Sequence, residues 1–182
     1  MPRYRIVPQA SQVWIDAHSM LHPINTRTDG LEGHLDVVVR DGQVDLTVPP
    51  SGRLSFEVER LSSGNRFEDR ELHRRLDARR FPTIDGVLAG MEPTGDGRYD
   101  VSGTITFRGV TRTYKDAMEV DVTDGRTIRL RGRAQFDIRD FGMDPPRLLF
   151  VRVEPQVDVR VEILAQLPDD AGDPGDAGKG ED

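Results

Sequence analysis

The stretch that decides the fold is GRTIRLRGRAQFDIRDFG, residues 125–142. Apolar or small residues occupy every second position between 128 and 138, and charged or polar residues occupy the positions between them. This period of two predicts a β-strand with one buried face and one solvent-exposed face. At about 3.3 Å per residue the strand would span roughly 40 Å, whereas an ordinary strand has about 5–6 residues. A strand of this length needs long neighbours.

The last apolar run of the chain supplies one such neighbour, because Val157, Val159, Val161 and Ile163 alternate with charged residues. Similar runs, bounded by turn signals such as those at 41–42 and 124–125, mark the other strands. The predicted strands cover residues 4–7, 13–19, 31–39, 44–48, 54–58, 83–91, 99–107, 113–122, 127–138 and 149–165, the last with a break or bulge at Pro155.

Residues 65–80 break this alternation and are predicted to form the helix of the chain. Asn65, followed three residues later by Glu68, fits a helix capping box. Glu71 precedes Arg75 by four residues, a spacing that favours an ion pair along a helix. Three apolar residues give the helix a narrow stripe: Phe67, Leu72 and Leu76.

A chain of strands with short turns must hide its sheet edges, either by closing into a barrel or by stacking two sheets. We predict an all-β fold, an antiparallel barrel of about eight strands with one short helix. Closure at about this number leaves room for side chains or for one small ligand. The alternation assigns the following residues to the lumen: Leu35, Val37, Phe56, Val101, Gly103, Ile105, Phe107, Leu130, Gly132, Ala134, Phe136, Val159 and Val161.

The small residues on this inward face have two interpretations. Gly33, Gly103, Gly132 and Ala134 lie at its centre. They can leave an open lumen for an apolar guest, since their neighbours are large aliphatic and aromatic residues. They can instead mark bends at the corners of a barrel whose interior is filled. From the residues alone, the bend is the preferred interpretation.

Composition limits the classes of function. The chain contains no cysteine, so disulfides and thiolate chemistry are excluded. The net charge is −7, and the acidic stretch 169–182 carries most of it. The near-neutral remainder argues against a nucleic-acid partner. We expect one domain at 1–167, followed by a disordered acidic tail rich in Gly and Asp at 168–182. The first residues lack the apolar run of a signal peptide, so we expect a cytoplasmic location.

An ordered set of short motifs resembles the YceI-like domain family. The motifs are Asp16-Ala17-His18-Ser19, Gly30-Leu31-Glu32-Gly33, and the runs at 80–84, 103–111, 139–143 and 157–159. The resemblance covers about residues 1–167. It implies a lipocalin-like antiparallel β-barrel whose apolar lumen binds long apolar molecules, isoprenoid lipids in particular.

The helix departs from the pattern of that family. Many members carry an Arg-Asp-x-His-Leu run there, whereas this chain has Glu68-Asp69-Arg70-Glu71-Leu72-His73. Any contact of that run with a ligand head group is therefore not carried over. The resemblance also implies that many members are exported. The first residues of this chain lack the signal for export, so we do not expect it here.

Candidate catalytic chemistry is sparse. The sequence lacks a Gly-x-Ser-x-Gly motif and a Gly-rich phosphate loop, so we predict no enzyme and no cofactor. A metal site built from His18, His22, Glu32 and His34 is disfavoured, because a strand and a loop do not bring this spacing onto one face. His18 is interpreted instead as a hydrogen-bonded histidine at the mouth of the barrel.

The arginines of the helix also have two interpretations. Arg70 and Arg74 can belong to a basic lid that meets an anionic head group or a membrane surface. They can instead be part of a solvated face on which acidic neighbours balance the charge. The second is preferred.

The predicted function is binding, with sequestration or transport, of a long apolar ligand of the isoprenoid type. The alternative is a filled barrel that acts as an interaction or stress-response module without a lipid. A small hydrolase or isomerase that uses histidines at the barrel mouth ranks last. Transient contact with a membrane surface and the oligomeric state, homodimer included, are both left open.

Overall fold

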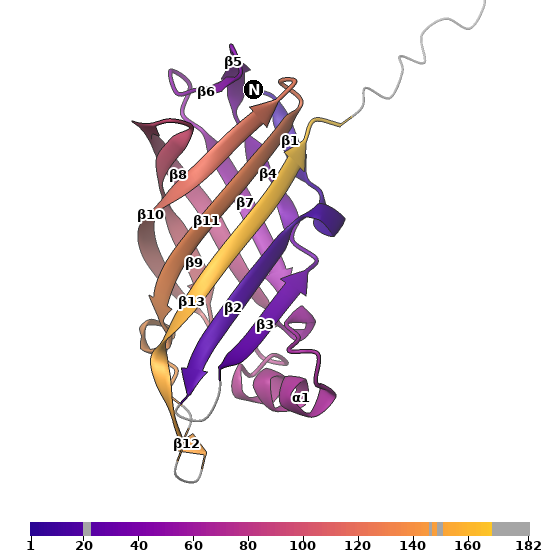
Figure 1. The fold of residues 1–182 in the computed structure, drawn as a ribbon, viewed down its shortest axis with the longest axis vertical. Coiled ribbons are helices and arrows are strands. Elements are labelled where there is room, and N and C mark those ends of the chain that lie inside the picture. The colour runs from indigo at the N-terminus through magenta and orange to yellow at the C-terminus, as the bar shows by residue number, and fades with distance from the viewer. Residues whose placement is uncertain (20–22, 146, 149–150, 169–182) are drawn as a thin grey trace, which may run out of the picture.

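A computed structural model describes residues 1–19, 23–145, 147–148 and 151–168. Strands dominate it (Figure 1). They are β1 (Arg3–Ile6), β2 (Gln12–Ser19), β3 (Ile24–Asp29), β4 (Glu32–Asp36), β5 (Val38–Arg40), β6 (Gln43–Asp45), β7 (Ser51–Glu57), β8 (Thr83–Gly95), β9 (Arg98–Phe107), β10 (Val110–Thr123), β11 (Thr127–Asp137), β12 (Arg147–Leu148) and β13 (Val151–Gln166). The helical elements are η1 (Pro8–Ala10), η2 (Val58–Arg60), α1 (Arg66–Arg75) and η3 (Ile138–Phe141).

The main sheet closes into an antiparallel barrel of eight strands, as predicted. Its neighbours follow the order β1-β4-β7-β8-β9-β10-β11-β13, and β13 returns to β1 through the pairs Arg5 with Gln166 and Ile6 with Ala165. Along the rest of β13, β2 takes the place of β1 as its neighbour. β3 then pairs with β2, in the place that β4 has beside β1. Closure therefore leaves no long free edge at the β1–β13 seam.

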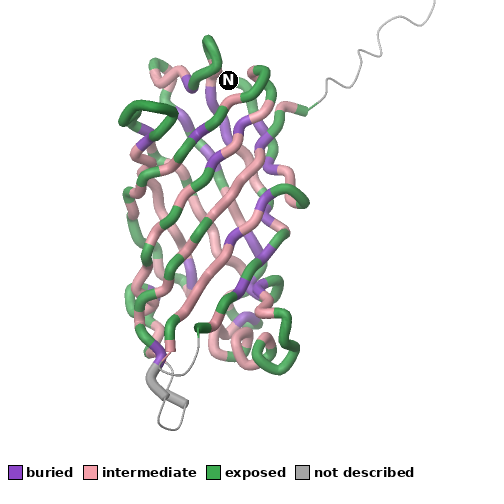
Figure 2. Tube along the Cα trace, in the orientation of Figure 1, coloured by how far each residue is buried: buried purple, intermediate pink, exposed green. Residues whose placement is uncertain are grey.

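The long strands have the faces that the period of two predicts. In β11 the side chains of Ile128 and Leu130 are buried, whereas Arg131 and Arg133 are exposed. β13 runs beside β11 with Gly132 opposite Val161 and the same alternation. Figure 2 shows half-buried and exposed residues following one another along the middle of the wall.

The turns agree with the sequence in most places. Asp41 and Gly42 adopt φ values of 51° and 74°, and Asp124 and Gly125 adopt 54° and 66°, which tight hairpins require. β6 is shorter than the predicted strand 44–48, because the Asp45 carboxylate accepts hydrogen bonds from Thr47 and turns the chain. Pro155 lies in a register shift of β13 rather than ending it. Residues 149–150, predicted to start that strand, lie outside the described residues, as does the predicted tail from 169 onward.

The α-helix begins where the capping residue predicts. The Asn65 side chain accepts a hydrogen bond from the Phe67 backbone N–H at 3.0 Å. Leu72 and Leu76 pack against the apolar interior, but Phe67 is 82% exposed and does not share their stripe. The reason is spacing, since Phe67 precedes Leu72 by five residues, which at about 100° per residue places the two side chains on different sides of the helix. None of the helices in the described part of the chain is long and apolar enough to cross a membrane.

The two ends of the barrel are closed to different degrees. A cluster of buried side chains fills the end that carries β5 and β6, and we call it the plug. Its buried members are Tyr4, Leu35, Val37, Val44, Met91, Tyr99, Val120, Ile128, Leu130 and Ala165. At the opposite end α1 and η3 lie across the opening, where Phe141 packs near Phe107. We call this end the mouth.

Candidate functional site

Between the plug and the mouth lies an apolar cavity of about 950 Å³. This volume is at the upper end of the roughly 300–1,000 Å³ of small-molecule sites. The cavity is lined by every residue assigned to the lumen from sequence except Val37: Leu35, Phe56, Val101, Gly103, Ile105, Phe107, Leu130, Gly132, Ala134, Phe136, Val159 and Val161. These side chains are inside the barrel but still border empty space, so the interior is not filled.

Val37 is the exception, and the prediction that it lines the lumen is wrong. Its side chain is fully buried in the plug, and its backbone N–H donates to the Pro2 carbonyl at 3.3 Å. The alternation gave the correct face of the strand. It carries no information on depth along the barrel, and Val37 lies just after β4 ends, at the filled end.

Two of the inward glycines, Gly103 and Gly132, have different surroundings. At Gly103 a Cβ atom would collide with the backbone carbonyl of Val87, so this glycine allows two strands to approach closely. At Gly132 a Cβ atom would lie 3.1 Å from Met118 Cγ and Cε and 3.6 Å from Val161 Cγ1. Those neighbours are side chains in the cavity wall, so Gly132 widens the lumen.

The inner face of α1 forms one side of the mouth. Phe67, Glu68, Glu71, Leu72 and Arg75 border the cavity there. Asp69 anchors the helix to the preceding loop, because its carboxylate accepts hydrogen bonds from the Ser62 hydroxyl and from the backbone N–H and hydroxyl of Ser63 at 2.6–2.8 Å.

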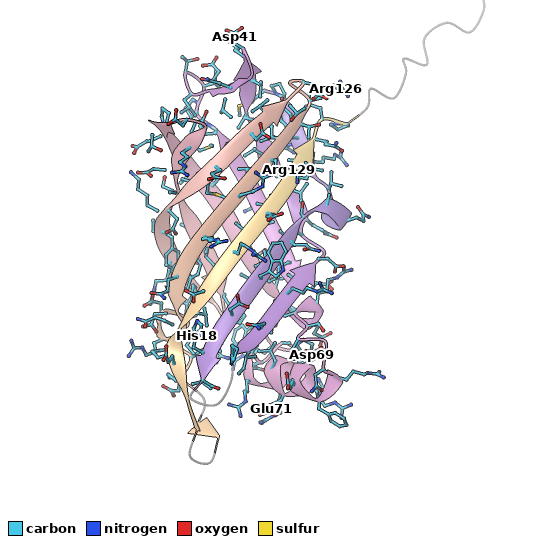
Figure 3. All side chains as sticks on the ribbon, viewed as in Figure 1. His18, Asp41, Asp69, Glu71, Arg126 and Arg129 are labelled. Carbon is cyan, nitrogen blue, oxygen red and sulfur yellow. The ribbon has the colours of Figure 1, made fainter. Side chains whose placement is uncertain are left out.

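Glu71, labelled in Figure 3, forms two ion pairs on α1. Its carboxylate accepts hydrogen bonds from Arg74 Nη2 and from Arg75 Nε, both at 2.7 Å. These two guanidinium groups, Arg74 first, lower the pKa of Glu71 to about 2. The ion pair with Arg75 confirms the spacing argument for this helix and keeps the rim of the mouth charged.

The three residues predicted at the mouth do not border the cavity. Arg70 and Arg74 are exposed on α1, and the neighbouring positions that face inward are Glu71, Leu72 and Arg75. A helix turns by about 100° per residue, so an arginine-rich segment places its charges on several faces, and the sequence did not show which face meets the barrel.

His18 lies on the outer face of β2 (Figure 3). Its Nε2 is 2.8 Å from the Asp158 carboxylate of β13, and this hydrogen bond raises the pKa of His18. The alternation in β2 contains the signal for this placement, since Val13, Ile15 and Ala17 line the cavity and His18 follows with the opposite parity.

The residues considered as metal ligands do not form a cluster in the described part of the chain. Glu32 and His34 lie on β4, and His34 is 3.7 Å from Asp36, which is itself paired with Arg3. Within the described ranges no three His, Asp or Glu side chains are arranged to hold a metal ion. His22 lies outside those ranges.

The barrel wall opens between β10 and β11, which the sequence did not reveal. β10 pairs with β9 along its length from Val110 to Glu119, but its pairing with β11 stops at Met118 opposite Gly132. From residue 133 to residue 137, β11 is paired only with β13. The cavity reaches Ala117 and Arg133, whose side chains are exposed on the outside. We call this opening, between residues 110–117 and 133–137, the side slot.

A second feature missed from the sequence is an acidic group inside the cavity. Asp116 of β10 borders the cavity, and burial raises the pKa of its carboxyl. Its parity along the strand is that of Tyr114, Met118 and Val120, which all lie on the inner face. Applying the alternation to the strand 113–122 would have found it.

The fold and the cavity together define a class of protein, a closed antiparallel β-barrel around an elongated apolar cavity. The family model described as YceI-like domain matches residues 4–165. The chain belongs to this family, as the ordered motifs indicated.

Among curated proteins, the chain is similar to proteins described as UPF0312. One from Pseudomonas putida is 25% identical over 111 residues, which is 56% of this chain and 58% of the relative. One from Pseudomonas fluorescens matches to the same extent. The chain thus spans a little over half the length of the curated relatives it matches.

Solved structures share the fold at low sequence identity. BcnA from Burkholderia cenocepacia has a TM-score of 0.74 at 17% identity and covers 88% of this chain and 99% of its own. A domain from Saccharophagus degradans, described as polyisoprenoid-binding, has a TM-score of 0.73 at 13% identity and covers 92% of this chain and 100% of its own. The YCEI protein of Campylobacter jejuni has a TM-score of 0.66 at 13% identity, covering 84% and 90%.

Proposed function

We propose that this protein binds a long apolar molecule, an isoprenoid-type lipid, inside the barrel and sequesters or transports it. The observation that carries the proposal is the apolar cavity of about 950 Å³, open at the mouth and lined by side chains from the wall strands. Burial of apolar ligand surface there would contribute about 25 cal/mol per Å² before the costs of association. The polyisoprenoid-binding description of the Saccharophagus domain supports this ligand class.

The role is that of a binding protein in the cytoplasm rather than an enzyme. The cavity surface is mostly apolar, and the polar residues that border it come from many different strands, whereas catalysis needs a nucleophile, a base and an orienting group in mutual contact. A filled interaction module is disfavoured by the empty interior.

Organic extraction of the purified protein, followed by mass spectrometry, tests the proposal directly. We expect a lipid of the isoprenoid class that is stoichiometric with the protein and displaceable by added isoprenoid alcohol. A protein that carries no lipid and that fails to bind any long apolar probe would contradict the function.

A variant that narrows the cavity makes the test specific. Gly132→Leu places a branched side chain in the lumen, where Met118 has a flexible chain that can move aside. We expect lipid to be lost while stability holds or rises, by at most about 1.5–3 kcal/mol. In a filled core the change would be overpacking and would cost about 1–3 kcal/mol. Ala134→Leu repeats the test at a second cavity position, and Arg131→Leu, on the exposed face of the same strand, is the matched control.

Lipid exchange would take place at a membrane surface through α1. Phe67 is 82% exposed beside the mouth, and α1 and the following turn carry four exposed arginines: Arg66, Arg70, Arg79 and Arg80. An exposed aromatic residue with basic neighbours suits an anionic bilayer. Phe67→Ser should weaken co-sedimentation with phosphatidylglycerol vesicles, whereas Val87→Ser, at an apolar residue 40% exposed on β8, should not. Equal binding by both variants would remove α1 from this role.

A further inference from the structure

Asp116 is an acidic residue in an apolar setting. Its partner across the β9–β10 ladder is Val101, and Val101 in turn pairs with Met91 of the plug. Tyr114 and Met118 flank it on the inner face of β10, and all three side chains border the cavity. The carboxyl therefore lies beside the filled end of the lumen, partly buried, at the upper edge of the side slot.

The carboxyl of Asp116 receives no hydrogen bond and no ion pair from the residues that the structure describes. Its neighbour Lys115 points to the outside, where it contacts Glu92 at 2.7 Å and Asp100 at 3.5 Å. Two other acids show the contrast, because Glu71 pairs with Arg75 and Asp158 pairs with His18. Partial burial disfavours the ionised form of this carboxyl, so a hydrogen-bond donor on a ligand would stabilise it.

The depth of Asp116 suits the end of a long molecule. The strand from Asp116 to Val110, which packs at the mouth, spans roughly 20 Å. An apolar chain can fill that length with its tail toward the mouth and its polar end toward the plug. At that end a carboxyl can accept a hydrogen bond, and it repels a second anion in a medium of low dielectric constant.

We propose, building on the lipid-binding function above, that Asp116 determines ligand specificity by accepting a hydrogen bond from a donor group on an isoprenoid-type ligand, a hydroxyl or an amine, held beside the plug. The same carboxyl excludes apolar molecules whose polar end is a carboxylate, such as fatty acids. Specificity of this kind combines an attractive contact with a repulsive one.

Three probes with one chain and different ends test this assignment. Geranylgeraniol has a donor, geranylgeranyl acetate has none, and geranylgeranoic acid is an anion at pH 7.5. Their affinities are measured by displacement of a fluorescent apolar dye from the full chain. We expect wild type to bind the alcohol at least about tenfold more tightly than the acetate or the acid, because a hydrogen bond to a charged group is strong.

Variants at position 116 separate the carboxyl from the rest of the cavity. Asp116→Leu should weaken alcohol binding by about tenfold and bring the acid to within about twofold of the alcohol. Asp116→Asn still accepts a hydrogen bond but cannot ionise. It should still bind the alcohol more tightly than the acetate, and it should bind the acid more tightly than wild type does. Asp121→Leu, on the exposed face of the same strand, should leave all three affinities unchanged.

The outcomes distinguish this inference from the proposed function. Wild type that binds all three probes within twofold, or a preference that survives Asp116→Leu, overturns the role of Asp116 while leaving lipid binding intact. Wild type that binds none of the probes overturns both. Dye binding and a cooperative thermal transition in each variant show that loss of affinity does not come from loss of fold.

Discussion

The ring of Tyr114 meets the ring of Phe136 edge to face, with centroids 4.6 Å apart, although the strands that carry them are not paired at this level. This contact bridges the side slot. If the register of the paired part of β10 and β11 continued, residue 114 would lie opposite residue 136. The two side chains are therefore in contact at that register, although the two strands are not paired there.

We predict that this aromatic pair holds the slot together. Tyr114→Ala removes both the ring contact and apolar burial, so it should lower the free energy of unfolding by about 1–3 kcal/mol. Tyr114→Phe is the control, because it deletes only a hydroxyl that lies 3.5 Å from Asp140. Urea denaturation of the two variants measures the difference, and equal midpoints would show that the ring contact contributes nothing.

The two inward glycines should respond differently to one added methyl group. Gly103→Ala pushes a Cβ into the Val87 carbonyl and should cost about 1–3 kcal/mol of stability. Gly132→Ala meets the flexible Met118 side chain and should cost less than about 1 kcal/mol. Thermal or urea unfolding of both proteins checks this order, and a reversed order would contradict the close approach of the strands at Gly103.

Asp116 should destabilise the fold as it ionises. Burial raises its folded pKa above the ordinary value of 3.8, so its contribution to stability is present below that value and is lost as the pH rises through the folded pKa. Asp116→Asn should therefore be more stable than wild type at pH 7.5, with the gap closing toward pH 4. Urea unfolding at several pH values, with Asp121→Asn as control, measures the gap; a gap independent of pH would refute the prediction.

Glu71 should show the opposite pH dependence. Its folded pKa of about 2 lies below the ordinary value of 4.5, so the stability it contributes is present above pH 4.5 and is lost as the pH falls toward 2. Wild type should lose its advantage over Glu71→Gln in this interval. Helix content by circular dichroism and unfolding midpoints follow the loss. Parallel titration curves for the two proteins would mean that the Arg74 and Arg75 contacts are not retained in solution.

The sequence predicted the wall of the site better than its openings. A period of two assigns a face to each strand residue, and that was enough to place Leu130, Phe136 and Val161 around the cavity. It cannot assign depth along the axis, which is why Val37 was placed in the lumen and lies in the plug.

The openings depend on contacts between segments distant in sequence. Which face of α1 covers the mouth is decided by packing of Leu72 and Leu76 on the barrel, so Arg70 and Arg74 could not be placed from charge alone. The side slot arises where two strands part, and neither strand changes its pattern there. His18 and Asp116 are different, because the alternation of their own strands would have been sufficient to place both, although it was not applied to them.

Because β1 pairs with β13, the barrel can close only late in the synthesis of the chain. Its closing pairs join residues 5 and 6 to residues 166 and 165, so the wall is incomplete until nearly all of the described chain has been made. Pairing between such distant segments is also slow compared with local hairpins. At synthesis rates of about 5–20 residues per second, the early strands wait for seconds with their apolar faces uncovered. Under the proposed function, a lipid would have no cavity to occupy during translation, and the barrel would fold before it is loaded.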